Sequence, residues 1–204
     1  MRRPSDLLAT AAAGLVVVLL AACGVPTDDQ PRAISREQAP DVDEGENDTS
    51  PAVTDTATLF LTQVDGDTNR LVPVPEQVPV DTSSTPTPRT ALETLLSYTP
   101  NEAQRAQGFT TRIPPNTALA SSPELDEDGV LLVNLNSNID TIQAEGSRLA
   151  FGQIVCTADS FDEVEAVQFQ VEGQPRAAPR GDGETSPDPV TCLDYANLID
   201  EQPG

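Results

Sequence analysis

The chain has 204 residues, and its 11 basic residues, all arginine, stand against 33 acidic ones, so the formal net charge is −22 at pH 7. A chain this acidic is not expected to bind nucleic acid or anionic lipid headgroups, because both repel negative charge. It contains no histidine, which excludes Ser-His-Asp and Cys-His nucleophile systems and removes the commonest metal ligand. We therefore expect no catalytic residues and no cofactor.

Residues 1–22 have the pattern of a secretory signal peptide, with a basic start and an almost uncharged run from 7 to 22. The run ends in LAAC at 20–23, which resembles a bacterial lipobox. The resemblance implies cleavage before Cys23 and diacylation of its thiol, and two or three acyl chains give stable anchoring. The alternative is an uncleaved membrane anchor, since about 20 apolar residues can span a bilayer.

The next segment, residues 23–56, is expected to be a disordered tether. Its residues 24–56 contain nine acidic residues, many Pro, Ser and Thr, and no aromatic residue. Such a segment cannot bury enough apolar surface to offset the entropy lost on ordering. As a flexible coil it would hold the domain roughly 30 Å from the anchor.

The first half of the domain that follows contains two predicted strands and a helix. Residues 57–64 are rich in β-forming residues, and residues 65–69 have turn chemistry. Residues 70–80 are extended but carry three prolines, which suits an edge strand rather than a central one. Thr87 before Pro88 predicts the start of a helix, which continues as an amphipathic stripe of alanine and leucine.

The second half contains two further strands and a second long helix. Residues 130–136 predict a strand, and residues 145–161 predict a helix with Ser147 as its candidate cap. Residues 164–173 alternate as a half-buried strand does, and residues 190–201 predict a last short helix. Runs of strands with two main helices indicate an α+β fold, here a small sheet with both helices on one face.

Two cysteines remain once Cys23 is assigned to the lipid. Cys156 and Cys192 form an even pair in a chain that we expect to be exported. Such a pair predicts a disulfide. The alternative is two separate buried thiols.

The acidic residues between 65 and 76 have part of the spacing of a calcium-binding loop. Asp65, Asp67, Asn69 and Glu76 fall at positions 1, 3, 5 and 12 of an EF-hand loop. Position 6 is Arg70 where glycine is required, and strands rather than helices flank the segment. A hairpin turn is the preferred interpretation, and a metal site at these four residues is a weak candidate.

Four features in order resemble the GerMN domain, the sporulation and spore-germination domain found in lipoproteins of high-GC Gram-positive bacteria. They are an Ala-Leu-x-x-Leu-Leu helix, an Ile-Pro-Pro turn, a Gly-Val-Leu-Leu-Val-Asn-Leu strand, and a Gln-Ile-Val helix leading to Val-x-Phe-x-Val-Glu-Gly. The resemblance covers residues 57–175. It implies a small α+β fold similar to ring-building motifs, in extracytoplasmic membrane-associated proteins without known catalytic residues. Gln153 and residues 113–117 belong to this pattern, and we expect them to be structural.

The expected organisation is a signal peptide (1–22), an acidic tether (23–56), a GerMN-like domain (57–175) and a C-terminal loop with a short helix (176–204). The expected function is a non-catalytic interaction or scaffolding domain, lipid-anchored on the extracytoplasmic face of the cell membrane, with an unidentified envelope protein as partner. The alternative is a ligand-binding accessory subunit, for a cell-wall fragment or calcium, that modulates a membrane sensor or transporter. A cell-wall hydrolase is disfavoured by the scarcity of aromatic residues.

Overall fold

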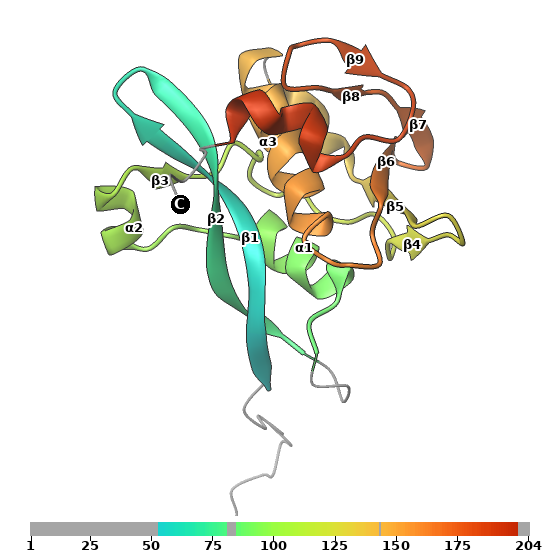
Figure 1. Cartoon of the computed structure of the whole chain (residues 1–204), viewed down its shortest axis with the longest axis horizontal. Helices are drawn as coiled ribbons and strands as arrows, with labels where there is room; N and C mark the ends of the chain where they lie inside the picture. Colours follow the sequence, from blue (N-terminus) through green and yellow to red (C-terminus); the bar gives the residue numbers. More distant parts are fainter. Residues whose placement is uncertain (1–52, 81–84, 143, 200–204) are drawn as a thin grey trace, which may run out of the picture. The chain divides into compact units, whose positions relative to one another are not determined.

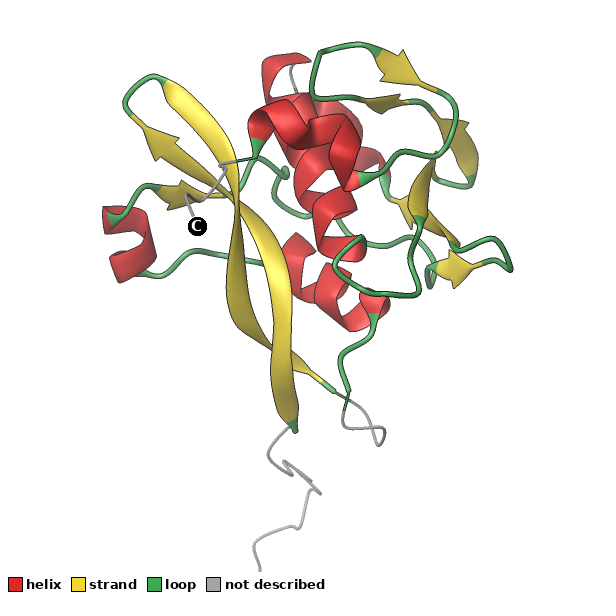
Figure 2. Cartoon of the chain, viewed as in Figure 1, coloured by secondary structure: helices red, strands yellow, loops and turns green. Residues whose placement is uncertain are grey.

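The computed structural model of this chain describes residues 53–80, 85–142 and 144–199. These residues belong to one compact unit, Asp48–Gly204. The predicted signal peptide, Cys23 and nearly all of the predicted tether lie outside the described residues. The described part has the α+β class that the sequence predicts, with helices and short sheets packed together (Figure 1, Figure 2).

The first sheet is built on a long hairpin. Strands β1 (Thr54–Asp65) and β2 (Thr68–Pro79) pair antiparallel along their whole length, and the short strand β3 (Phe109–Thr110) pairs with the other side of β1. The sheet order is β2-β1-β3, so β2 is an edge strand, as predicted. Figure 1 shows the hairpin as the longest feature of the described domain.

The three prolines of β2 leave its hydrogen bonds to β1 intact. Pro73, Pro75 and Pro79 are an even number of residues apart, so their backbone nitrogens point to the same side of the strand. Val80, one residue further, donates its N–H to the carbonyl of Val53 at 3.0 Å, which places the prolines in the other set, facing the open edge. The strand is therefore continuous, and its open edge lacks donors at three positions.

The other edge of β1 is completed by side chains of a helix. The N–H of Phe60 donates to Oγ1 of Thr157 at 2.9 Å, and Nε2 of Gln153 donates to the carbonyl of Phe60 at 3.1 Å. Both side chains come from α3 (Ala144–Ala158), and both are fully buried. Helix α3 thus occupies the position where the sheet would otherwise add a strand.

The same glutamine also holds the segment before the Ile-Pro-Pro turn. Oε1 of Gln153 accepts hydrogen bonds from the N–H of Arg112 at 2.8 Å and from the hydroxyl of Thr62 at 3.3 Å. The turn that follows is closed by the N–H of Thr117, which donates to the carbonyl of Pro114 at 3.2 Å. Gln153 is thus bonded to a neighbouring strand and to a neighbouring segment, as expected.

The second sheet has the order β4-β5-β6-β7. Its strands are β4 (Glu124–Leu125), β5 (Val130–Leu135), β6 (Ala166–Val171) and β7 (Gln174–Arg176). Strands β5 and β6 are parallel and therefore need a crossover, which consists of the 3-10 helix η2 (Ser137–Thr141) and α3. Figure 1 shows α3 between the hairpin and this sheet.

The remaining elements are short. Helix α1 (Pro88–Leu96) is capped by Thr87, as predicted, and α2 (Glu102–Ala106) follows it. Strands β8 (Ala178–Pro179) and β9 (Thr185–Ser186) form a two-stranded sheet, and the 3-10 helix η3 (Cys192–Leu198) follows.

The strands divide among three small sheets where the sequence suggests one. The edge of β1 that carries β3 is occupied at Phe60 by the bonds from Thr157 and Gln153, so no longer strand extends the first sheet toward the second. The core lies between the two larger sheets and is made mostly of leucine, isoleucine and valine from β1, β5, β6, α1 and α3.

Removing the amide of Gln153 should destabilise the fold strongly. Gln153→Leu keeps the side-chain size but leaves the carbonyl of Phe60 and the N–H of Arg112 without partners. We expect the free energy of unfolding to fall by about 2–4 kcal/mol in urea denaturation of the full-length protein. Gln107→Leu, at the exposed C-cap of α2, is the control and should change it by less than about 0.5 kcal/mol. Equal effects of the two substitutions would contradict the role of Gln153.

Candidate functional site

The four residues of the weak calcium candidate do not form one cluster. Asp65, Asp67 and Asn69 lie at the β1–β2 turn, where Oδ1 of Asn69 accepts a hydrogen bond from Arg112 at 2.6 Å. Glu76 lies further along β2, opposite Ala57. No group of three or more His, Cys, Asp or Glu with metal-binding geometry occurs in the part of the chain that the structure describes.

Glu76 instead takes part in a hydrogen-bonded triad that joins the hairpin to the α1–α2 region. Tyr98 donates its hydroxyl hydrogen to Oε1 of Glu76, and Nε2 of Gln104 donates to the same oxygen at 2.8 Å and to the tyrosine oxygen at 2.6 Å. Burial, followed by the bond to Glu76, raises the pKa of Tyr98 from its ordinary 10.0 to about 12. The raised pKa keeps the phenol protonated, and so a hydrogen-bond donor, to a higher pH than an ordinary tyrosine.

The C-terminal segment is fastened to α3 by a disulfide. Cys156, near the end of α3, is bonded to Cys192, the first residue of η3, across a sequence separation of 36. This is the pair that the sequence analysis indicates. Beyond residue 176, the predicted loop contains the short strands β8 and β9, and the short helix predicted over 190–201 is present as the 3-10 helix η3.

Tyr195 of η3 completes the packing of this segment against the domain. Its ring is fully buried, and its hydroxyl donates to the carbonyl of Pro179 at 2.9 Å. Burial raises its pKa well above the usual range. The approach is close because Gly152 of α3 has no side chain: a Cβ there would lie 2.9 Å from Cδ1 of Tyr195 and 2.6 Å from Cδ1 of Leu71.

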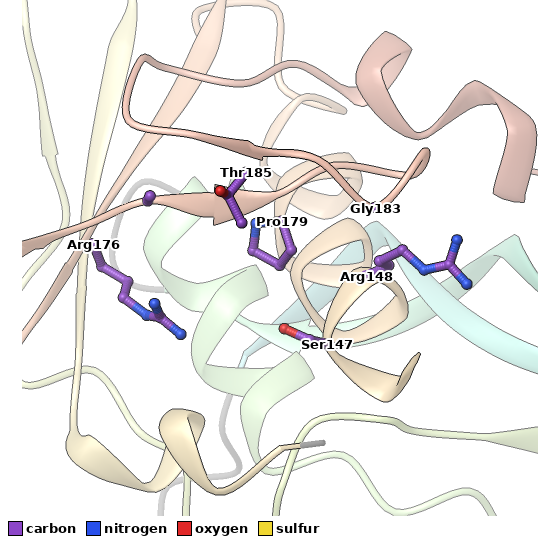
Figure 3. A pocket seen from close by; sticks show the side chains of 7 residues that line it. Ser147, Arg148, Arg176, Pro179, Gly183 and Thr185 are labelled. Carbon is purple, nitrogen blue, oxygen red and sulfur yellow. The ribbon is translucent and has the colours of Figure 1, made fainter. Parts of the chain in front are cut away.

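A pocket of about 400 Å³ lies between the N-terminal half of α3 and the C-terminal segment (Figure 3). The prediction of Ser147 as the N-cap of this helix is wrong. Ser147 lies within the helix, because α3 begins at Ala144. The pocket is lined by two residues of α3 and five of the segment that follows β6: Ser147, Arg148, Arg176, Ala177, Pro179, Gly183 and Thr185.

The two arginines of the pocket differ in their contacts. In Figure 3 the side chain of Arg176 extends toward Ser147, whereas the guanidinium of Arg148 points away on the opposite side. Nε of Arg176 lies 3.0 Å from Oδ1 of Asp140, in an ion pair whose two side chains are 41% and 46% exposed. Arg148 donates to the carbonyl of Gly181 at 3.0 Å and so supports the pocket wall.

A second cavity, of about 520 Å³, lies between the end of α1 and the Ile-Pro-Pro turn. It is lined by Leu96, Ser97, Tyr98, Thr99 and six residues of the segment 111–117. Ser97 donates its hydroxyl hydrogen to the carbonyl of Glu93 at 2.9 Å, and the hydroxyl oxygen of Thr111 accepts from the N–H of Ile113 at 3.2 Å, whereas the buried hydroxyl of Thr117 has no hydrogen-bond partner among the described residues.

Neither cavity follows from a local pattern in the sequence. For the pocket beside α3, the one signal in the sequence was the segment 174–183, QPRAAPRGDG, which contains two of the 11 arginines among prolines and glycines. Its position beside Ser147 is a tertiary contact that no local pattern encodes. Helices long and apolar enough to cross a bilayer are not found among the described residues.

Comparison with known families gives one match, which covers most of the described domain. The model of the Germane family, described as sporulation and spore germination, matches residues 58–177. This family is a sporulation-related one and not a known family of enzymes. A comparison with curated proteins gave no match.

Several solved structures are similar to this chain, and three of them are the following. The tandem GerMN domains of the sporulation protein GerM from Bacillus subtilis match with a TM-score of 0.53 at 23% identity, over 68% of this chain and 46% of that one. This chain thus spans about half of the tandem structure. The first GerMN domain of GerM from Bacillus subtilis has a TM-score of 0.44 at 16% identity, over 60% of this chain and 86% of its own. A candidate lipoprotein from Clostridium perfringens has a TM-score of 0.42 at 15% identity, over 73% and 95%.

Loss of the disulfide should loosen the C-terminal segment. For a separation of 36 residues, the chain-entropy model gives a stabilisation of about 4 kcal/mol. We expect the double substitution of Cys156 and Cys192 by alanine to lower the free energy of unfolding by about that amount in urea denaturation. In a reducing agent, the wild-type protein should have the same free energy of unfolding as the double variant. Without reducing agent, Cys23→Ala should keep the stability of the wild type. Identical stability with and without reductant would contradict a bonded pair.

The two tyrosines should ionise late and in order. The chain has two tyrosines and no tryptophan, so absorbance near 295 nm reports them directly. Because the folded pKa of Tyr98 is raised from 10.0 to about 12, the neutral phenol contributes stability below pH 10 that is lost as pH rises toward 12. We expect Tyr98→Phe to remove the earlier transition and Glu76→Gln to move it toward pH 10. A transition already at pH 10 in the wild type would contradict the triad.

Proposed function

The chain belongs to the sporulation and spore germination family, and from this premise we propose that it is a lipid-anchored, extracytoplasmic binding domain without catalytic activity. Its role is to hold a protein partner in the cell envelope. The match covers residues 58–177 only, so the family name does not identify the partner of the whole chain or the process in which it acts.

The observation that carries the non-catalytic part is the use of Gln153. This family-pattern amide is fully buried, and both ends of the amide are hydrogen-bonded inside the protein. The two tyrosines are likewise internal donors with raised pKa values. These polar side chains therefore make hydrogen bonds inside the protein, which supports a fixed shape rather than a reaction.

The anchoring part rests on the sequence before the domain. Cys23 follows an apolar run in a lipobox-like setting, and residues 24–56 provide an acidic spacer. The first described strand begins at Thr54, some thirty residues after Cys23. This order supports display of the domain at a distance from the outer face of the cytoplasmic membrane.

The partner should bind to side chains rather than add a strand. The open edge of β2 lacks donors at Pro73, Pro75 and Pro79, and Leu71 of the same edge is already bridged to Ile199. Strand addition depends on a regular set of main-chain donors and acceptors. We therefore place the partner surface on the helices or loops.

The second candidate, a ligand-binding accessory subunit, is favoured by one observation, the pocket of about 400 Å³ beside α3. If the ligand were calcium, a cluster of ligating residues would be needed, and none occurs in the described ranges. Its version with a small organic ligand is developed below.

The anchor and the partner can be tested in the same cells. Cys23→Ala should abolish the lipid mass on the mature protein and release it from the membrane fraction, because one change removes the acylated thiol. Intact-cell cross-linking followed by detergent purification and mass spectrometry should recover a specific envelope protein with the wild type and not with the variant. Retention of the variant in the membrane would contradict the anchor, and recovery of self-cross-links alone would replace a partner with self-assembly.

A further inference from the structure

We propose that the pocket between α3 and the C-terminal segment binds a small organic anion carrying one carboxylate or phosphodiester group, with Arg176 as the residue that contacts the anionic group. This site is independent of the anchored interaction role, since it requires neither Cys23 nor a protein partner. It is a property of the pocket that the family membership does not supply.

Arg176 is suited to accept an anion because its present partner is easily exchanged. The ion pair with Asp140 joins Nε to Oδ1 at 3.0 Å, and both side chains are more than two-fifths exposed. An exposed pair of this kind contributes at most about 1 kcal/mol. A guanidinium has five N–H donors arranged to match a carboxylate or a phosphate, so donors beyond Nε are available to a ligand.

The other lining groups complete a site for a molecule with a polar end and an apolar body. The hydroxyls of Ser147 and Thr185 can each donate to an anionic oxygen. Ala177 and Pro179 supply apolar surface between them, and Figure 3 shows Pro179 and Thr185 on one side with Ser147 facing them. A volume of about 400 Å³ is within the range of small-molecule sites.

The charges around the pocket select for a single negative charge. Asp140 is paired with Arg176, and the acidic residues Asp182 and Glu184 are the chain neighbours of Gly183, which lines the pocket. These carboxylates repel a polyanion while leaving room for one anionic group on the guanidinium. The ligand class is therefore a monoanion, and long wall polyphosphates are disfavoured.

The pocket exists because this chain extends past the family domain. The family match ends at residue 177, whereas Pro179, Gly183 and Thr185 lie beyond it. That wall is held in place by the bond of Arg148 to Gly181, by the hydroxyl of Tyr195 on the carbonyl of Pro179, and by the disulfide at Cys192. The site is thus shared: Ser147, Arg148, Arg176 and Ala177 lie within the matched residues, and the wall that closes the pocket over them lies beyond the match.

The test is equilibrium binding to the full-length protein in detergent, measured by calorimetry at low and physiological salt. The probes are acetyl-alanyl-alanine with a free carboxylate, its C-terminal amide as the neutral control, and glycerophosphoglycerol as the phosphodiester. We expect the carboxylate or the phosphodiester to bind and the amide to fail, with affinity falling as salt rises. Binding of the carboxylate alone assigns a peptide-type ligand, and binding of the phosphodiester alone assigns a phosphate-type ligand.

Three matched substitutions locate the site. Arg176→Gln should weaken binding at least about tenfold, because it removes charge-assisted hydrogen bonds. Asp140→Asn should strengthen it about two- to fivefold, because it removes the competing carboxylate. Arg89→Gln is the control and should have no effect: Arg89 also forms an exposed ion pair, with Glu93 at 2.8 Å, but within α1.

The outcomes separate this site from the anchored interaction role. Cys23→Ala should bind the anion as the wild type does, so failure of the anchor leaves the pocket standing. Equal binding of carboxylate and amide, no binding of any probe at millimolar concentration, or unchanged affinity in a folded Arg176→Gln protein would overturn the proposal. Folding of each variant is checked by its urea midpoint.

Discussion

The described domain depends on the contact between one strand edge and one helix. Phe60 of β1 exposes a backbone N–H and carbonyl to α3, and the buried side chains of Thr157 and Gln153 satisfy both. A buried polar group without a partner is costly, so this set of bonds fixes α3 both along and across the strand. Since Ser147 and Cys156 are carried on the same helix, its placement also fixes the pocket and the anchor point of the C-terminal segment.

Local sequence patterns predicted the longer strands and helices, but not how these are arranged into sheets. The hairpin, the cap at Thr87 and the strands β5 and β6 follow from alternation and turn residues, which act over a few positions. The division into several sheets does not, because it depends on polar side chains of α3 acting as the neighbour of β1. A glutamine inside an apolar helix shows that it has a partner but not which one. The short strands after residue 176 have no periodicity, and long-range contacts position them.

The pocket illustrates the same limit for function. Ser147 and Arg176 are far apart in sequence, and the segment between them forms most of α3 and β6. The predicted pairing of the cysteines was the one sequence feature that tied the C-terminal segment to α3. Because that bond joins the segment beyond the family domain to the domain itself, oxidation adds a covalent link to a wall that Arg148 and Tyr195 also hold by hydrogen bonds. Disulfides persist in oxidising compartments outside the cytosol, so in such a compartment the pocket wall would keep this covalent link.

The prolines of β2 have a consequence for crowding. Lipid anchoring confines molecules to a thin layer, where the local concentration of neighbours is far above that of the same number in solution. An exposed strand edge in such a layer is a template for pairing between identical chains. At Pro73, Pro75 and Pro79 that edge offers carbonyls without matching donors, so two copies that meet there cannot build a continuous ladder. Under the proposed lipid anchoring, this edge would therefore disfavour the joining of neighbouring copies into continuous sheets.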